Sequence, residues 1–333
     1  MAWSADARRI DVILTCGEAL IDVFVEPGEG LSRPAVFTAG GSPFNMALAL
    51  ARQGVAAGFF GGLSEDGFGA MLRAILDAEG VAHDLAPTLP NKTTLSIVAR
   101  DGHGRPSYDF RGERGADIAL TRDHVPRSLP AACRAVALSS YPLVLEPVCD
   151  AMRAMAQLAA RDRLVSVDVN YRPSLVGDRH VWVERFAPYE TMATIIKASE
   201  EDIALAYGGE RSCEAAAAHW LRRGAALVLI TRGEEGASAF LGERVITMKA
   251  PTVSVVDTVG AGDCFHAGFL AALDRHGALS RHALAAIGDD VLHGALAWAI
   301  TTASLNVARQ GTNPPRRQDI EAALAVQTQR LSA

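Results

Sequence analysis

The sequence predicts an α/β protein whose mostly parallel sheet is covered by helices on both faces. Apolar segments of strand length alternate with helical segments through most of the chain, which favours parallel strands joined by crossover helices. Residues 93–111 break this alternation, because two strand-like segments flank a hairpin-like turn at 101–104 with no helix between them. We therefore expect a small antiparallel flap inserted into the α/β framework.

Composition places the chain among globular proteins and excludes several partners. The 333 residues are 49% hydrophobic and 21% charged, enough apolar content to exclude disorder as the main state. No apolar run is long enough to span a bilayer, and residues 1–9 carry charge without the apolar stretch of a signal peptide. Five scattered cysteines suit a reducing cytosol, and the net charge of -6 argues against a nucleic-acid surface. We expect a cytoplasmic protein without membrane or nucleic-acid partners.

The first part of the chain is predicted to hold short strands and two helices. Strands are expected at 12–14, 23–25 and 57–61, with a break at 27–30. Ser42 is the expected N-cap of a helix at 44–52, with Pro43 in its first turn and Gly54 after its end. A second helix is expected at 66–78.

After the flap, the sequence again predicts strands that alternate with helices. Strands are expected at 135–138, 164–169, 194–197 and 226–230, and helices at 145–160 and 213–222. The chain turns helical from residue 262 onward.

A glycine-rich turn at 253–265 carries most of the chemical information. β-branched residues at 253–256 predict a strand, and the turn then leads into a helix at 267–273. Free N–H groups of residues 261–263 at a helix N-terminus form an anion site. A carboxylate there, Asp263, could accept the proton of an alcohol attacking phosphorus, although capping the helix is its alternative role. The chain has no P-loop motif, and Phe265 stands where a dinucleotide fingerprint requires its third glycine.

Two segments resemble the signatures of the ribokinase-like, or PfkB, carbohydrate kinases. Residues 257–265 (DTVGAGDCF) are similar to the C-terminal signature, and residues 40–47 (GGSPFNMA) to the N-terminal one. The resemblance runs from residue 17 to about 316 and is strongest to fructokinases. It implies one domain over residues 1–333, with a β-sheet lid from about 18–40 and 92–116, the sugar between lid and core, and ATP along the C-terminal half.

The resemblance also implies roles for individual residues. Asp263 would be the catalytic base, and the turn formed by Gly260, Ala261 and Gly262 would hold the transferring phosphoryl group. The implied substrate-binding residues are Asp22, Gly41, Asn45, Arg111, Asn170 and Arg172. The implied ATP-binding residues are Ser199, Thr231, Gly233, Gly236 and Asn306.

Metal ions are implied at two further places. Residues 199–202 are similar to the family's N-x-x-E segment, with Ser for Asn and Asp for Glu, so Asp202 or Glu201 would arrange Mg²⁺ through water. Asp257 resembles the family's ligand for a monovalent cation, which leaves open whether K⁺ activates the protein. His266 and His293 have no second ligand four residues on and are expected to be ordinary helix residues.

These patterns predict an ATP-dependent kinase acting on a primary hydroxyl of a sugar, with fructose as the first choice. The segment Asp168-Val169-Asn170-Tyr171-Arg172 looks more fructokinase-like than ribokinase-like. Ketodeoxygluconate kinase, ribokinase and nucleoside kinase remain alternatives, although Asp109-Phe110-Arg111 stands where ketodeoxygluconate kinases usually carry Tyr-Tyr-Arg. A non-catalytic sensor is a further alternative, which would have no need of the Asp263 base. Exposed sheet edges on the flap predict a homodimer through the lid.

Overall fold

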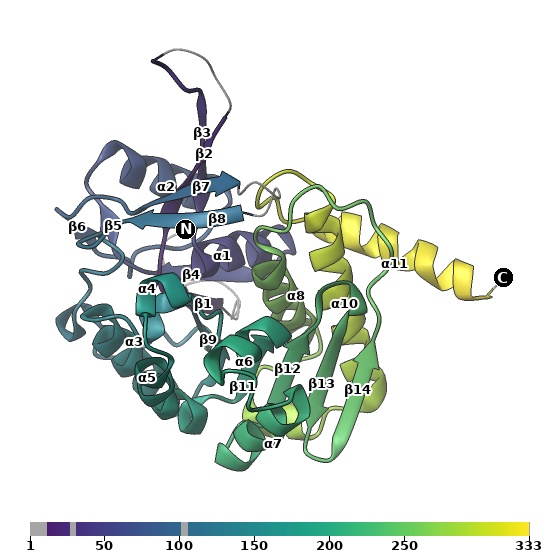
Figure 1. Cartoon of the computed structure of the whole chain (residues 1–333). Coiled ribbons are helices and arrows are strands. Elements are labelled where there is room, and N and C mark those ends of the chain that lie inside the picture. Colours follow the sequence, from purple (N-terminus) through teal and green to yellow (C-terminus); the bar gives the residue numbers. More distant parts are fainter. Residues whose placement is uncertain (1–11, 27–30, 101–105, 333) are drawn as a thin grey trace.

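The computed structural model describes residues 12–26, 31–100 and 106–332, which form two main β-sheets and the helices around them (Figure 1). The large sheet has the order β14-β13-β12-β11-β10-β9-β1-β4. Neighbouring strands from β4 to β12 are parallel, whereas the pairs β12–β13 and β13–β14 at one edge are antiparallel. The strands are β1 (Val12–Cys16), β4 (Ala56–Phe60), β9 (Cys133–Ser139), β10 (Leu164–Asp168), β11 (Ile195–Ser199), β12 (Leu227–Thr231), β13 (Ala237–Leu241) and β14 (Arg244–Met248). The predicted, mostly parallel sheet is confirmed.

Helices cover both faces of this sheet, because its strands alternate their side chains between two apolar layers. Ile13 belongs to one buried cluster and its neighbour Leu14 to the other. The first layer contains α1 (Ser42–Arg52), α8 (Ala261–Arg275) and α10 (Asp289–Val307). The second contains α3 (Val148–Ala159), α5 (Arg179–Met192), α6 (Glu200–Ala206) and α7 (Cys213–Arg223).

A separate four-stranded sheet, which we call the lid, has the order β3-β2-β7-β8. Its strands are β2 (Leu20–Val25), β3 (Ala35–Gly40), β7 (Leu95–Arg100) and β8 (Pro106–Arg111). The pair β7–β8 is antiparallel, as the flap pattern predicted, whereas β2 pairs with β7 in parallel. The predicted turns at 27–30 and 101–104 lie outside the described residues.

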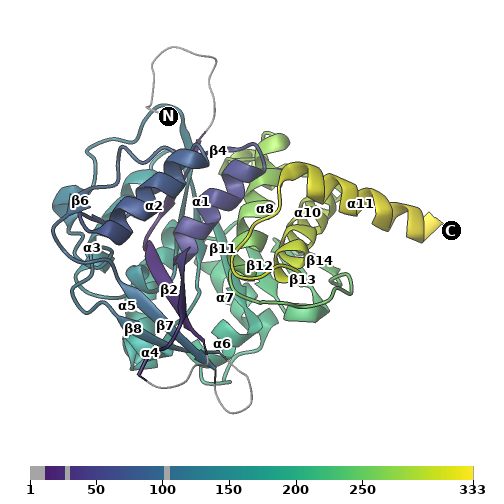
Figure 2. The same cartoon turned by 90° about the horizontal axis from the view of Figure 1, so that it is seen from above.

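The remaining elements are short or peripheral. They are β5 (Leu63–Ser64), α2 (Gly67–Ala78), β6 (Thr88–Leu89), α4 (Pro173–Val176), α9 (Arg281–Ala285) and α11 (Arg317–Ser332). Figure 2 shows α11 projecting from the body on the side opposite to α2. Within the described ranges, no helix has the length and hydropathy required to cross a bilayer.

The structure corrects three local expectations, all of them next to the site. Helix α1 begins at Ser42 with Gly41 as its N-cap, so the hydroxyl of Ser42 is free for another role. Residues 253–256 form no strand, because no neighbouring strand pairs with them, and α8 begins directly after Gly260 rather than at 267. The antiparallel edge strands β13 and β14 did not emerge from the sequence pattern.

Candidate active site

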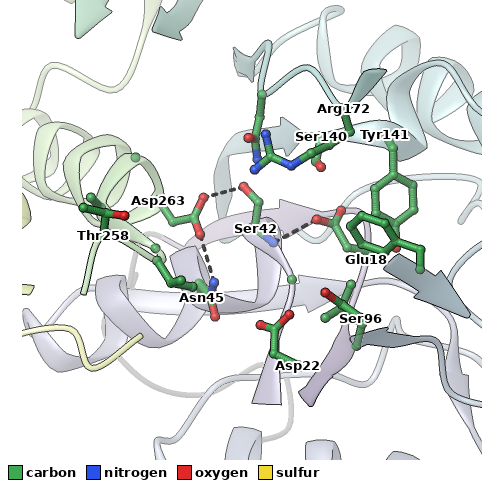
Figure 3. A pocket seen from close by; sticks show the side chains of 18 of the residues that line it. Glu18, Asp22, Ser42, Asn45, Ser96, Ser140, Tyr141, Arg172, Thr258 and Asp263 are labelled. Carbon is green, nitrogen blue, oxygen red and sulfur yellow. Dashed lines mark hydrogen bonds between the residues drawn. The ribbon is translucent and has the colours of Figure 1, made fainter. Parts of the chain in front are cut away.

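A polar cavity of about 190 Å³ lies where several strands of the large sheet end beneath the lid. Glu18 follows β1, Ser140 follows β9 and Asn170 follows β10, so all three reach the cavity from the carboxyl ends of parallel strands. Ligands of open α/β sheets bind at that end of the sheet. Asp22 of β2 and Ser96 of β7 contribute the lid side (Figure 3).

Most of the predicted substrate and transfer residues meet in this polar cavity. They come from segments separated by more than half the chain, and they are Asp22, Gly41, Asn45, Asn170, Arg172, Gly260, Ala261, Gly262 and Asp263. Their individual roles stay predictions.

Asp263 lies in the first turn of α8 and is buried, with both carboxylate oxygens bonded. The hydroxyl of Ser42 donates to Oδ1 at 2.6 Å, and the Asn45 amide donates to Oδ2 at 2.9 Å (Figure 3). Both donors come from α1, so the N-terminal and C-terminal signatures meet at this carboxylate. Asn45 was expected at the sugar, but its amide nitrogen holds Asp263. The side-chain oxygen of Asn45 is buried and has no hydrogen-bond partner among the described residues.

Glu18 is a site residue that the sequence analysis missed. Its Oε1 accepts the backbone N–H of Ser42 at 2.8 Å, and its buried Oε2 has no partner among the described residues. Burial raises the pKa of Glu18 to about 8, although the hydrogen bond from Ser42 opposes the shift. The sequence feature that could have identified Glu18 is its position two residues after a buried strand.

Asp22 is also a buried carboxyl, on the lid side of the cavity and opposite Arg172 (Figure 3). Burial raises the pKa of Asp22 to about 6, and the nearby charge of Asp263 adds to the increase. Asp22 is therefore mostly ionised at neutral pH and can accept hydrogen bonds from hydroxyl groups.

The glycine-rich turn has the backbone shape of an anion site. Gly260 is the N-cap of α8 with φ of 73°, and a Cβ there would come within 2.6 Å of the Thr312 side chain. The N–H of Ala261 donates a long hydrogen bond of 3.3 Å to the Thr258 carbonyl. The N–H groups of Gly262 and Asp263 have no acceptor within the described part of the chain and remain available to an anion.

A second, mainly apolar cavity of about 440 Å³ lies on the other side of this turn. Its lining includes the predicted nucleotide residues Thr231, Gly233 and Gly236, together with Phe265 and residues of α10 such as Ala303. Gly236 must be glycine, because its φ is 90° and a Cβ would come within 1.9 Å of the Met248 carbonyl oxygen. Thr258, Ala261 and Gly262 line both cavities, so the turn forms their junction.

The other predicted site residues lie outside both cavities in this structure. Arg111 is exposed and pairs with Asp109 across 2.5 Å. Asn306 is buried and braces two loops, donating to the Val259 carbonyl and accepting from the Asn313 N–H, so its side chain does not face the apolar cavity.

The predicted metal residues are engaged in local structure. Ser199 and Asp202 form a capping box at the start of α6, and Asp202 also accepts the Tyr171 N–H, so its oxygens are already bonded. Glu201 is exposed on α6. Asp257 accepts the N–H groups of Val259 and Gly311. Among the described residues, no group of three His, Cys, Asp or Glu side chains could hold a metal ion. These side chains do not fit a direct all-protein metal site.

Comparison with known proteins decides the family. The model of the pfkB family carbohydrate kinases matches residues 12–319. This chain belongs to that family. It is 34% identical to the fructokinase of Rhizobium leguminosarum bv. trifolii over 281 residues, which cover 84% of this chain and 85% of the relative. It is 31% identical to the fructokinase of Klebsiella pneumoniae, covering 94% and 99% of the two chains.

Solved structures agree with this membership. The fructokinase of Xylella fastidiosa with bound ATP superposes with a TM-score of 0.87 at 27% identity, over 95% of this chain and 99% of that chain. Aminoimidazole riboside kinase from Salmonella enterica gives a TM-score of 0.80 at 25% identity, over 94% and 99%. The predicted ribokinase-like fold and the predicted ATP-dependent sugar kinase activity are confirmed.

Proposed function

We propose that this carbohydrate kinase is a fructokinase, which transfers the γ-phosphoryl group of ATP to a primary hydroxyl of fructose. Fructokinases of both bacteria and plants are among its relatives. The observation that carries the proposal is the shared glycine-rich turn, because Asp263 and Gly262 lie where a polar, sugar-sized cavity meets a larger apolar one.

In the proposed reaction, fructose occupies the polar cavity with its attacking hydroxyl against Asp263. The carboxylate accepts the hydroxyl proton while Ser42 and Asn45 hold it in place. The N–H groups of Gly262 and Asp263 bind the phosphoryl oxygens, whose charge is spread over a loose transition state. The proton leaves late in such a transition state, so a carboxylate suffices as the base.

The remaining substrate hydroxyls are assigned to the lid side and to the loop after β10. Asp22 and Asn170 would accept or donate hydrogen bonds, and Arg172 would add a planar set of donors. In the second cavity, the apolar lining around Phe265 and Ala303 would take the adenine ring. Closure of the lid over bound sugar would exclude water from the transfer.

The proposed function also includes two metal ions, Mg²⁺ and K⁺. Mg²⁺ would bind the phosphates of ATP and neutralise part of their charge, and Glu201, whose carboxylate is exposed, could reach it through water. Asp257 is the residue of this chain that would support a K⁺ site, beside the backbone of 257–259 and 311.

A homodimer through the lid is also proposed. Val36 and Phe37 lie on β3, an edge strand of the lid, and each is nearly half exposed, at 47% and 45%. Apolar side chains on an unpaired strand edge favour pairing with a second copy. Sedimentation of the parent protein and of a Phe37→Lys variant tests this assembly.

A phosphorylation screen tests the proposed function. ATP turnover is measured over fructose, ketodeoxygluconate, ribose, tagatose, adenosine and aminoimidazole riboside, with kcat/KM for each. We expect fructose to give the highest kcat/KM. A higher value for any other substrate assigns the protein to that substrate and rejects the fructokinase proposal.

A further inference from the structure

Lys197 is a buried cation that none of the assigned roles uses. It lies on β11 between the fully buried residues Ile196 and Ala198, and only 3% of its surface is exposed. A charged side chain within a central strand of the sheet is costly unless its charge is paired or used. Its ammonium reaches the sheet's neighbouring strand β10, where Nζ donates to Asp168 Oδ2 at 2.9 Å.

The Lys197–Asp168 pair leaves hydrogen-bonding capacity at both ends. An ammonium group has three N–H donors, and the contact with Asp168 uses one of them. Asp168 Oδ1 is buried without a partner among the described residues. An ion pair with a purely structural role would be expected to satisfy these groups, so the donors of Lys197 that no described residue accepts point to a ligand.

The ammonium of Lys197 lies beside the glycine-rich turn. A Cβ added to Gly262 would lie 2.9 Å from Nζ of Lys197. Gly262 does not have a positive φ, so the backbone itself would accept another residue there. A side chain at position 262 would therefore meet the ammonium, which lies beside the turn at the junction of the two cavities.

The ammonium keeps its charge in this place. Burial lowers the pKa of Lys197, but the charges of Asp168, Asp202 and Asp263 raise it more, and the net shift is upward. The charged groups on β10, α6 and α8 that act on Lys197 are therefore acidic, and Arg172 is a second cation in the lining of the polar cavity. A phosphoryl group with several negative charges would find in Lys197 a fixed positive charge inside a desolvated site.

We propose that Lys197 is a catalytic residue whose ammonium binds an oxygen of the γ-phosphate and stabilises the negative charge of the transferring phosphoryl group. In this step the bond from the sugar oxygen to phosphorus forms, and the bond from phosphorus to the β,γ-bridging oxygen breaks. The sugar proton passes to Asp263, and ADP leaves with the electron pair of the broken bond. The proposal rests on the kinase reaction and is independent of which sugar is the substrate.

A double substitution separates this role from a structural ion pair. Lys197→Met removes the charge at similar length and leaves Asp168 without its partner, so this variant is expected to lose stability. Combining Lys197→Met with Asp168→Asn replaces the ion pair by a neutral pair, which should restore much of the stability. Lys92→Met, at an exposed lysine, serves as the control for removal of a lysine charge.

We expect the double variant to have the melting temperature of the Asp168→Asn protein. Its kcat should stay lower than that of Asp168→Asn by roughly 10²–10³, the loss typical of one transition-state hydrogen-bond donor. Titration calorimetry without sugar should show weaker binding of ATP, by about tenfold, and unchanged binding of AMP, which lacks the terminal phosphates.

The proposal is overturned if kcat returns together with the melting temperature, or if ATP and AMP affinities change equally or not at all. Because the nucleotide titrations require no sugar, they test Lys197 even where the preferred substrate is not fructose. Failure of the fructokinase proposal would instead be seen in the parent enzyme, as a higher kcat/KM for another sugar.

Discussion

The two cavities beside the glycine-rich turn differ in how they would recognise a ligand. Buried or partly buried ionisable groups line the polar cavity, among them Glu18, Asp22, Arg172, Lys197 and Asp263. Among the described residues that line the apolar cavity, only Glu234 is charged. A sugar offers hydroxyls that must each be matched, whereas an aromatic base can be held largely by shape and apolar contact. Substitutions in the polar cavity should therefore change turnover, sugar affinity or ionisation, and those in the apolar cavity mainly the affinity for ATP.

The largest expected effect is at Asp263. Asp263→Asn keeps the shape and the helix-capping ability but removes the base, so kcat should fall by roughly 10²–10⁴ with little change in either KM. Steady-state kinetics measure this. Asp66→Asn is the matched control, because Asp66 caps α2 away from both cavities, and its turnover should equal that of the parent. Near-parent turnover of Asp263→Asn would mean that Asp263 only caps the helix.

A variant of Glu18 tests the cost of burying a negative charge in the polar cavity. Its pKa is raised from 4.5 to about 8 in the folded protein, so the folded state binds its proton more tightly than the unfolded state between these values. The parent should therefore lose stability as pH rises through this range, by up to about 1.4 kcal/mol per pH unit. Glu18→Gln, which keeps an acceptor for the Ser42 N–H, removes that loss.

Urea unfolding at several pH values measures the difference between the two proteins. We expect the variant's stability relative to the parent to increase steadily up to about pH 8. A difference that does not depend on pH would show that Glu18 ionises normally in the folded protein.

Asp22 should determine sugar affinity through its ionised form. Asp22→Ala is expected to raise the fructose KM by about 10–100-fold, the result of losing hydrogen bonds worth roughly 1–3 kcal/mol, and to leave the ATP KM unchanged. Because the pKa of Asp22 is about 6, the parent's fructose KM should increase as pH falls below that value, where the carboxyl becomes protonated. Glu113→Ala, at an exposed position after β8, is the control. A fructose KM that is flat from pH 5 to 8 contradicts this assignment.

The smallest effect is expected in the apolar cavity. Ala303→Leu adds volume to the lining, so it should raise the ATP KM by about tenfold and leave fructose affinity unchanged. Ala297→Leu adds the same volume elsewhere on α10 and should have no effect on either KM. Equal changes in the ATP and fructose KM values would contradict separate roles for the two cavities.

The sequence alone determined the architecture and the residues at the transfer point. Alternating apolar segments predicted the parallel sheet, since their periodicity is a local property of the chain. The lid hairpin was visible for the same reason. The glycine-rich turn and Asp263 were also recognisable, because an anion site at a helix N-terminus is built from consecutive residues.

Only the tertiary structure brought Ser42, Glu18 and Lys197 together in one cavity. Ser42 looked like a helix cap, yet its hydroxyl bonds Asp263, which lies 221 residues further along the chain. Asn306 and Asp202 looked like ligand-binding residues, yet their polar atoms are taken by neighbouring loops and by a capping box. The sequence predicted only that Lys197 ends a strand. Its position beside Gly262 depends on how α8 packs over the sheet. Hydrogen bonds and buried charges act over a few ångströms, so their partners follow from the packing of distant segments rather than from spacing in the sequence.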